Sequence, residues 1–296
     1  MFSLENIRRP EWLKVRLRSG RYSREVKDLL KSENLFTVCQ SAHCPNIGDC
    51  WSKRTATFMI LGNICTRNCK FCAVQSGNPK QLDSNEPVRV ARAVEKLGLR
   101  HAVITSVTRD DLSDGGSRLF AESIKMIRSY SPKCSIEVLI PDFNGNRIAL
   151  YNVFQAEPDI LNHNLEVVSR LYPKARSKAK FKVSFNILRK AKKHQLVTKT
   201  GIMLGLGENL TEVEELIMRL SDINLDILTI GQYLQPSRKH LKVEKYYHPD
   251  EFNALKEFGE QKGIKYIESG PLVRSSYHAI EQKNKLYHNQ LSEDIN

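Results

Sequence analysis

Residues 56–72 read ATFMILGNICTRNCKFC, a short apolar run followed at once by three closely spaced cysteines. The run over residues 56–62 contains β-branched and aromatic side chains and is too short for a typical helix, so it predicts a buried strand. Cys65, Cys69 and Cys72 follow it with the spacing C-x3-C-x2-C; we call them the downstream triplet. In a parallel sheet this loop lies at the carboxyl edge, where active-site loops gather.

The rest of the chain continues the same alternation of strand and helix. Strand-like runs are predicted at residues 102–107, 135–140, 159–163, 201–206 and 226–234, and helical periodicity is found at residues 88–97, 117–130, 146–155, 182–194 and 211–223. A seventh strand-like run covers residues 264–269, and the stretch from Thr211 to Glu214 resembles a capping box. Six successive βα units imply a parallel sheet, because each crossover returns the chain to the same end.

Length decides how this sheet closes. A complete eight-unit barrel takes about 250 residues, whereas residues 56–262 offer fewer. We therefore predict the α/β class, as a partial (βα)6 TIM-type barrel over residues 53–263. An N-terminal extension, residues 1–52, carries three more cysteines, and a short C-terminal extension covers residues 264–296.

Composition narrows the class of protein. With 296 residues, 41% of them hydrophobic, the chain is globular, and no apolar run is long enough to span a bilayer. The first residues do not read as a secretory signal, which predicts a cytoplasmic protein. The net charge of +13 favours anionic partners, which by charge alone include nucleic acid, an acidic protein or a membrane face.

Six of the seven cysteines lie between residues 39 and 72. Their odd total and the predicted compartment argue against disulfides and favour metal or cluster ligation. Three thiolates supply three of the four ligands of a four-iron cluster, so one iron stays open to a substrate or cofactor. A zinc site remains the alternative on spacing. Cys134 stands apart and is predicted to be a buried small apolar side chain.

Motifs along nearly the whole chain resemble one family. The downstream triplet, with Phe71 before its last cysteine, resembles the signature of radical S-adenosylmethionine (SAM) enzymes, whose partial (βα)6 barrel agrees with the six units. Cys39, Cys44 and Cys50 form C-x4-C-x5-C, which we call the upstream triplet, and it is similar to the auxiliary-cluster motif of lipoyl synthases. Further segments similar to that family are TSVTRDDLSDGG from Thr105, EVLIPDFNG from Glu137, NHNLE from Asn162, GIMLGLGE from Gly201 and RSSY from Arg274.

The resemblance implies two four-iron, four-sulfur clusters. The downstream triplet would hold the cluster whose open iron binds SAM, and the reduced cluster would cleave SAM to a 5'-deoxyadenosyl radical that abstracts hydrogen. The upstream triplet and Ser276 would hold an auxiliary cluster that supplies two sulfur atoms, inserted at C6 and C8 of a protein-bound octanoyl chain. Two SAM molecules are spent per lipoyl product.

The resemblance also implies contacts and partners. Asn162, Asn164, Glu166, Gly201 and Gly205 are expected to contact SAM. The octanoylated carrier would be a lipoyl domain of a 2-oxoacid dehydrogenase or a glycine cleavage H protein, the reductant ferredoxin or flavodoxin, and an iron–sulfur carrier protein is a further partner. Neither nucleic acid nor a membrane is expected. As a hypothesis, the basic N-terminal segment steers an acidic partner, to be tested by charge reversal at Arg16, Arg18 and Arg21.

Two alternatives remain open on the residues alone. Another radical SAM enzyme that inserts sulfur, such as a biotin synthase or a methylthiotransferase, would lack the pairing of the upstream triplet with RSSY. A basic zinc-binding nucleic-acid module would account for the charge and the cysteine clusters. His43 is expected to be structural or solvent-exposed rather than a ligand, and the glycines from Gly205 to Gly207 do not complete a dinucleotide fingerprint.

Overall fold

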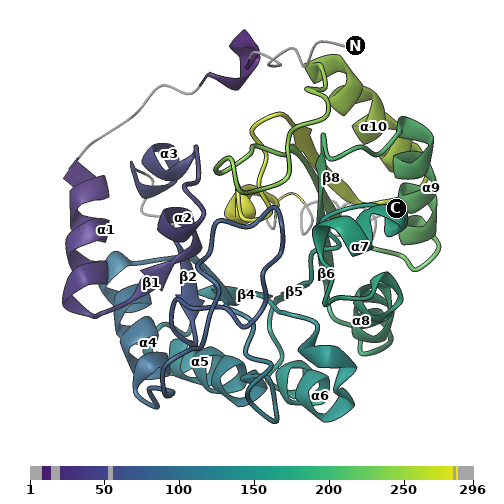
Figure 1. The fold of residues 1–296 in the computed structure, drawn as a ribbon. Coiled ribbons are helices and arrows are strands. Elements are labelled where there is room, and N and C mark those ends of the chain that lie inside the picture. Colours follow the sequence, from purple (N-terminus) through teal and green to yellow (C-terminus); the bar gives the residue numbers. More distant parts are fainter. Residues whose placement is uncertain (1–8, 15–20, 53–55, 283–284, 286–296) are drawn as a thin grey trace.

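A computed structural model describes residues 9–14, 21–52, 56–282 and 285. These residues form one eight-stranded sheet in the order β1 to β8, with β1 and β8 at its two edges (Figure 1). The strands are β1 (Phe36–Thr37), β2 (Thr57–Ile60), β3 (His101–Ser106), β4 (Ser135–Leu139), β5 (Ile160–Asn162), β6 (Thr198–Leu204), β7 (Ile227–Gln232) and β8 (Tyr266–Gly270).

Neighbouring strands from β2 to β8 are all parallel, and β1 alone runs antiparallel, pairing Phe36 with Met59 of β2. Because the strand order follows the chain order, each helix returns the chain to the next position along the sheet. The sheet is therefore an open barrel of the expected kind.

Helices cover the outside of the curved sheet (Figure 1). They are α4 (Glu86–Leu97), α5 (Ser117–Tyr130), α6 (Arg147–Gln155), α8 (Phe181–Lys193), α9 (Leu210–Ser221) and α10 (Pro249–Gln261). A further helix of similar length, α1 (Arg21–Ser32), precedes β1. The shorter elements are α2 (Val38–Ser41), α3 (Ile47–Ser52), α7 (Tyr172–Ala175) and three 3-10 turns at Glu11–Leu13, Phe143–Gly145 and Ser169–Leu171. The apolar stripes of α4 and α5, including Val90, Val94, Phe120 and Ile124, are fully buried against the sheet.

The expected strands and helices are present with small shifts at their ends, and the structure adds elements that the sequence analysis did not predict. Among them are the two-residue strand β1, the short helices α2, α3 and α7, and the helix α10. The capping box prediction was wrong in register. The helix α9 begins earlier than predicted, because Asn209, in extended conformation, is its N-cap and its side chain accepts the Glu212 backbone N–H. The Glu212 side chain in turn accepts the Asn209 backbone N–H and completes the capping box.

Polar side chains cross the interior of the barrel below the carboxyl edge. The Glu137 carboxylate of β4 lies 3.0 Å from the Lys199 ammonium of β6 and accepts a 2.8 Å hydrogen bond from the Asn162 amide of β5. Burial alone would raise the pKa of Glu137, but Lys199, with further contributions from His101 and Asn162, lowers it to about 2. The pair is fully buried, so losing either partner would leave an uncompensated charge in the core.

Two further observations bear on earlier expectations. Of the residues proposed for charge reversal, Arg16 and Arg18 and the side chain of Arg21 lie outside the described residues. Among the helices that are described, none has the length and apolar character needed to cross a bilayer.

Candidate functional site

A large cavity of about 640 Å³ opens at the carboxyl edge of the strands. Cys65, Cys69 and Cys72 line it together with residues that follow β3, β4 and β5. The structure thus brings the downstream triplet to the edge of the sheet where the strand-then-cysteine order predicted it. We refer to this space as the large cavity.

Backbone hydrogen bonds fix the loop that carries the downstream triplet. The Cys65 sulfur accepts the backbone N–H groups of Arg67 and Thr108, at 3.4 and 3.3 Å. Burial raises the pKa of the Cys69 thiol and raises that of Cys72 to about 12. Binding of a metal by Cys69 and Cys72 must therefore release their thiol protons. At Cys65 two backbone N–H groups already donate to the sulfur.

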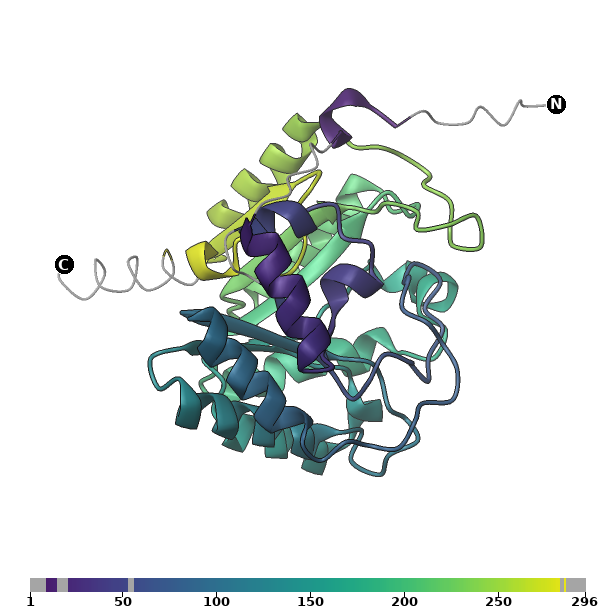
Figure 2. The same ribbon diagram turned by 90° about the vertical axis from the view of Figure 1, so that its left-hand side faces the viewer.

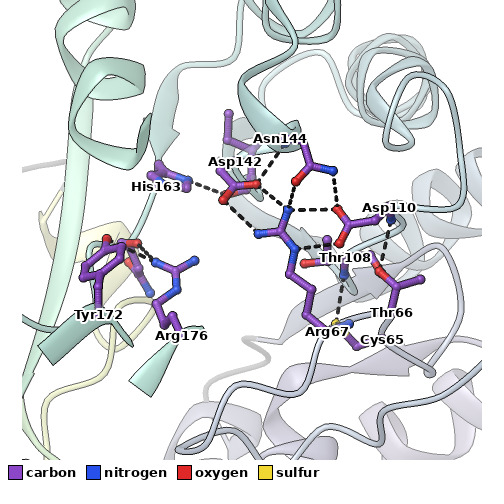
Figure 3. Close-up of polar contacts among 12 residues, drawn as sticks. Cys65, Thr66, Arg67, Thr108, Asp110, Asp142, Asn144, His163, Tyr172 and Arg176 are labelled. Carbon is purple, nitrogen blue, oxygen red and sulfur yellow. Dashed lines mark hydrogen bonds and ion pairs between the residues drawn. The ribbon is translucent and has the colours of Figure 1, made fainter. Parts of the chain in front are cut away.

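Arg67 anchors this loop to its neighbours (Figure 3). Its guanidinium donates to both carboxylate oxygens of Asp110, which follows β3, and to both of Asp142, which follows β4, at 2.7 to 2.8 Å. Asn144 accepts a further 2.6 Å hydrogen bond. Burial alone would raise the pKa of Asp142, but Arg67 outweighs it and holds that pKa below its ordinary value. We call these four residues the Arg67 clamp.

A small cavity of about 170 Å³ lies beside the large one, and all members of the upstream triplet line it together with Ser276. Cys39 sits in α2, which the Thr37 side chain caps, Cys44 follows α2, and Cys50 sits in α3. Burial raises the pKa of the Cys39 thiol to about 11 and also raises that of Cys44. Residues more than 220 positions apart in the chain thus face one space.

Two contacts bring the C-terminal segment to this cavity. The buried Asn46 amide, between Cys44 and Cys50, donates to the Leu272 carbonyl oxygen at 2.7 Å. The Val273 carbonyl oxygen lies so close to Gly231 of β7 that an added Cβ would be 2.2 Å from it. Gly231 is therefore required for close backbone approach rather than for an unusual φ. Together these contacts set the position of Ser276.

The two cavities share a wall, which includes Val38, Ala42, Asn164, Glu166, Met203 and the segment from Arg274 to Ser276. Arg274 donates to the Val273 carbonyl oxygen. Burial lowers the pKa of Arg274 below its ordinary value, and the nearby Cys44 opposes this shift only in part. The half-buried guanidinium of Arg274 in this wall favours negative charge on either side of it.

Three buried polar atoms at the large cavity have no partner among the described residues: Asn164 Oδ1, His163 Nε2 and Arg176 Nε. Such atoms are usually satisfied by a ligand or water. The Arg176 guanidinium also donates to the Asn164 carbonyl oxygen at 3.0 Å and contacts Tyr172 (Figure 3). Burial raises the pKa of Glu166, and Arg176 opposes that rise.

The remaining residues expected to contact SAM are placed unevenly. Gly201 lines the small cavity, and an added Cβ there would lie 2.9 Å from Asn164 Oδ1. Gly205 has a φ of +104° and leaves room for the Gln232 amide, which lines the large cavity. Asn162 lines neither cavity, since its amide is used by Glu137 in the barrel interior. His43 is exposed at the rim of the large cavity, and Cys134 is buried beside β4.

The donor sets fit iron–sulfur clusters. Each cavity presents three thiols on its walls, and the small one adds a hydroxyl. Within the described part of the chain no three His, Cys, Asp or Glu side chains converge closely enough to hold a single ion. Thiols spread around a space suit a group with several metal atoms better than one tetrahedral ion. The sequence reasoning missed Arg67, Arg176 and Gln232, which carry no motif of their own.

Comparison with known proteins gives a consistent result. The sequence pattern of the radical SAM superfamily matches residues 59–220. The lipoyl synthase of Symbiobacterium thermophilum is 56% identical over 277 residues, covering 93% of this chain and 87% of that protein. The lipoyl synthase of Bacillus subtilis is 53% identical over 284 residues, covering 95% of each.

Solved structures share the fold at low identity. SuiB of Streptococcus suis, in its complex with S-adenosylmethionine, has a TM-score of 0.56 at 11% identity, over 75% of this chain and 54% of that one. The FeFe-hydrogenase maturase HydG of Carboxydothermus hydrogenoformans has a TM-score of 0.55 at 15% identity, over 77% and 65% of the two chains. These likenesses concern the fold alone.

Proposed function

Because this chain belongs to the lipoyl synthases of the radical SAM superfamily, we propose that its two cavities divide that family's reaction between them. The enzyme is a sulfurtransferase that inserts two sulfur atoms into a protein-bound octanoyl chain to form the lipoyl group. As a radical SAM enzyme it uses a four-iron, four-sulfur cluster and SAM.

We assign the downstream triplet to the cluster that binds SAM. Bound there, cluster and SAM supply the carbon radical that removes hydrogen from the octanoyl chain. The chain's task is orientation. The half-buried Arg176, whose buried Nε has no partner among the described residues, lines the large cavity with the downstream triplet and suits the SAM carboxylate. Asn164 and Glu166 suit the other polar groups of SAM. Asn162 is left out of this set, because the Glu137 carboxylate already uses its amide.

We assign the upstream triplet and Ser276 to a second, auxiliary cluster that supplies sulfur. The observation that supports this assignment is the small cavity, whose lining includes the three cysteines of the upstream triplet and Ser276 and which shares a wall with the large cavity. A hard serine oxygen among soft thiolates favours a labile site. A cluster held by these residues would supply sulfur beside the wall that the small cavity shares with the large one.

The partners follow from family membership and charge. The substrate is an octanoylated carrier protein, and we propose that a lipoyl domain or an H protein fills this role. A ferredoxin or flavodoxin as reductant and an iron–sulfur carrier protein that restores the auxiliary cluster complete the proposal, as does a cytoplasmic location. The division of the chain at residues 52/53 and 263/264 likewise stays a prediction.

Single substitutions separate the two roles. Cys69→Ala is expected to abolish formation of 5'-deoxyadenosine, whereas Cys44→Ala should leave it intact and stop lipoyl formation. The matched control is Cys134→Ala, which removes a buried thiol outside both triplets and should keep both products. The measurement is mass spectrometry of an octanoylated carrier peptide after anaerobic incubation with SAM and dithionite. Lipoyl product from Cys44→Ala at the wild-type yield would contradict the assignment.

The nucleic-acid alternative makes a different prediction. A zinc-binding module would take up stoichiometric zinc and show no brown iron–sulfur chromophore after anaerobic reconstitution with iron and sulfide. Under our proposal the reconstituted chain carries two four-iron clusters, and Cys44→Ala carries one. Iron and sulfide analysis with Mössbauer spectroscopy distinguishes these outcomes.

A further inference from the structure

Three segments lie side by side on the outer face of the loop that carries the downstream triplet. The Lys70 backbone N–H donates to the Ala175 carbonyl oxygen, and the Lys70 carbonyl oxygen accepts the Leu241 N–H, both at 2.9 Å. The Lys178 ammonium donates to the Thr66 carbonyl oxygen at 3.2 Å. These hydrogen bonds join the cluster loop, the segment after α7 and the long loop before α10 into one surface. In Figures 1 and 2 the loop after β2 and the loop before α10 extend on the same side of the sheet.

This surface is strongly basic. Two of its lysines are neutralised, since Lys174 pairs with Glu244 and Lys245 pairs with Glu251. Five other exposed cations make no ion pair with any described residue, and we call them the basic rim: Lys70, Lys178, Arg238, Lys239 and Lys242.

One contact connects the rim directly to a cluster cysteine. His240, next to Lys239, places its Nε2 3.0 Å from the Cys72 carbonyl oxygen, and its Nδ1 lies 2.9 Å from the Ser237 hydroxyl. The rim is thus one side chain away from the downstream triplet. None of the five rim residues lines the large cavity, although Cys69, Phe71 and Cys72 of the same loop do.

We propose that the basic rim is the docking surface for an acidic protein that donates single electrons. The inference rests on the proposed function, in which the downstream triplet holds a cluster that must be reduced. One electron leaves the reduced cofactor of the donor, which is thereby oxidised by one electron, and reduces the cluster by one electron. No atom is transferred and no proton is needed in this step.

The placement favours an electron donor over the octanoylated carrier. An acyl chain must enter the large cavity, so its carrier has to dock over the opening of that cavity. An electron needs only a short path to the cluster, and the outer face of the cluster loop gives one. Transient electron-transfer complexes bury little surface and depend on charge complementarity, which a rim of unpaired cations provides.

Charge reversal of the rim tests the proposal. The test variant is Arg238→Glu/Lys239→Glu/Lys242→Glu, which leaves the cluster loop itself unchanged. The control is Lys182→Glu/Arg189→Glu/Lys193→Glu, which makes the same change of charge at exposed positions of α8. Stopped-flow spectroscopy follows the oxidation of reduced flavodoxin by the fully reconstituted enzyme over a range of ionic strength.

In the test variant we expect the bimolecular rate constant at low salt to fall by roughly ten- to a hundredfold, with loss of its normal decrease as salt rises. The control stays close to the wild type. With dithionite, a small reductant that needs no docking, the test variant forms 5'-deoxyadenosine at the wild-type rate. The neutral variant Arg238→Gln/Lys239→Gln/Lys242→Gln shows a smaller loss of the same sign.

Three results would overturn the proposal. The first is an unchanged rate with flavodoxin, and the second is an equal loss in the control on α8. The third is a raised KM for the octanoylated carrier with normal flavodoxin oxidation, which would make the rim a carrier surface. Failure of the proposed function looks different, because the wild-type enzyme would then form no 5'-deoxyadenosine even with dithionite.

Discussion

Replacing Arg67 by methionine tests whether the Arg67 clamp holds the cluster loop. The guanidinium makes five hydrogen bonds, and the side chains of Arg67 and Asp142 are only 4% and 3% exposed. Methionine fills much of the volume but leaves Asp142 as a buried charge that has lost its cation and keeps only the Asn144 backbone N–H as a donor. Breaking such a pair from one side costs about 3–5 kcal/mol, and we expect Arg67→Met to lose free energy of unfolding in that range.

The assay is anaerobic urea unfolding of the iron-free protein, so that cluster loss does not enter the measurement. Arg109→Met is the matched control, because Arg109 is equally buried but its partner Asp111 is 39% exposed. Water can solvate Asp111 after the substitution, so the expected loss is nearer 1 kcal/mol. In Arg67→Met/Asp142→Asn the two charges of the buried Arg67–Asp142 pair are removed and only the partly exposed Asp110 keeps its charge, so part of the stability should return.

The same variant has a functional readout. When the clamp is lost, the loop between Cys65 and Cys69 loses its side-chain link to the segment after β4 and keeps, toward the segment after β3, the hydrogen bonds of Cys65 and Thr66 with Thr108 and Asp110. We therefore expect the downstream cluster to be taken up incompletely. Electron paramagnetic resonance of the reduced protein, together with iron analysis, measures its occupancy. A loss of stability equal to that of Arg109→Met, with full occupancy, would refute this reasoning.

Three shorter predictions address other parts of the chain. Gly231→Ala places a Cβ 2.2 Å from the Val273 carbonyl oxygen, so it should lower occupancy of the auxiliary cluster in Mössbauer spectra while 5'-deoxyadenosine formation continues. Asn46→Ala removes a buried 2.7 Å hydrogen bond to the C-terminal segment and should cost about 1–3 kcal/mol in urea unfolding; an unchanged midpoint would contradict that contact. Although burial alone would raise the pKa of Glu137, Lys199 outweighs it and the net value is about 2. The native pKa is therefore below the unfolded value of 4.5, so this carboxylate stabilises the fold above pH 4.5 and the contribution is lost as the pH falls toward 2; Glu137→Gln should lack this part of the acid transition.

Much of the fold was predictable because local pattern and global architecture agree. Apolar runs of strand length alternate with amphipathic stretches, and each unit repeats the same physical requirement, a strand buried on both faces and a helix with one apolar stripe. The edge strand β1 of the sheet was less predictable. β1 is only Phe36–Thr37, too short to show alternation, and its pairing with β2 depends on tertiary contact.

Some residues of the candidate site could likewise be predicted from the sequence, and others could not. The cysteines could be found because their spacing is itself the signal. The Arg67 clamp could not, since its carboxylates lie 43 and 75 residues away and only the fold brings them together. Asn162 shows the opposite case: its motif suggested a cofactor contact, but its position in β5 directs the amide to Glu137. Residue type and motif do not determine which way a strand residue faces at the end of a sheet.

The donors at the small cavity come from both margins of the open sheet. Cys39 lies two residues beyond β1, the first edge strand, and Ser276 lies six residues beyond β8, the last. A group bound by both Cys39 and Ser276 would cross-link the two edges of the open barrel, and its consumption would remove the cross-link. Amide hydrogen exchange along Phe36–Thr37 and Tyr266–Gly270 should then slow when this group binds and become faster when it gives up sulfur. The local opening of the two edge strands would thus change with each turnover.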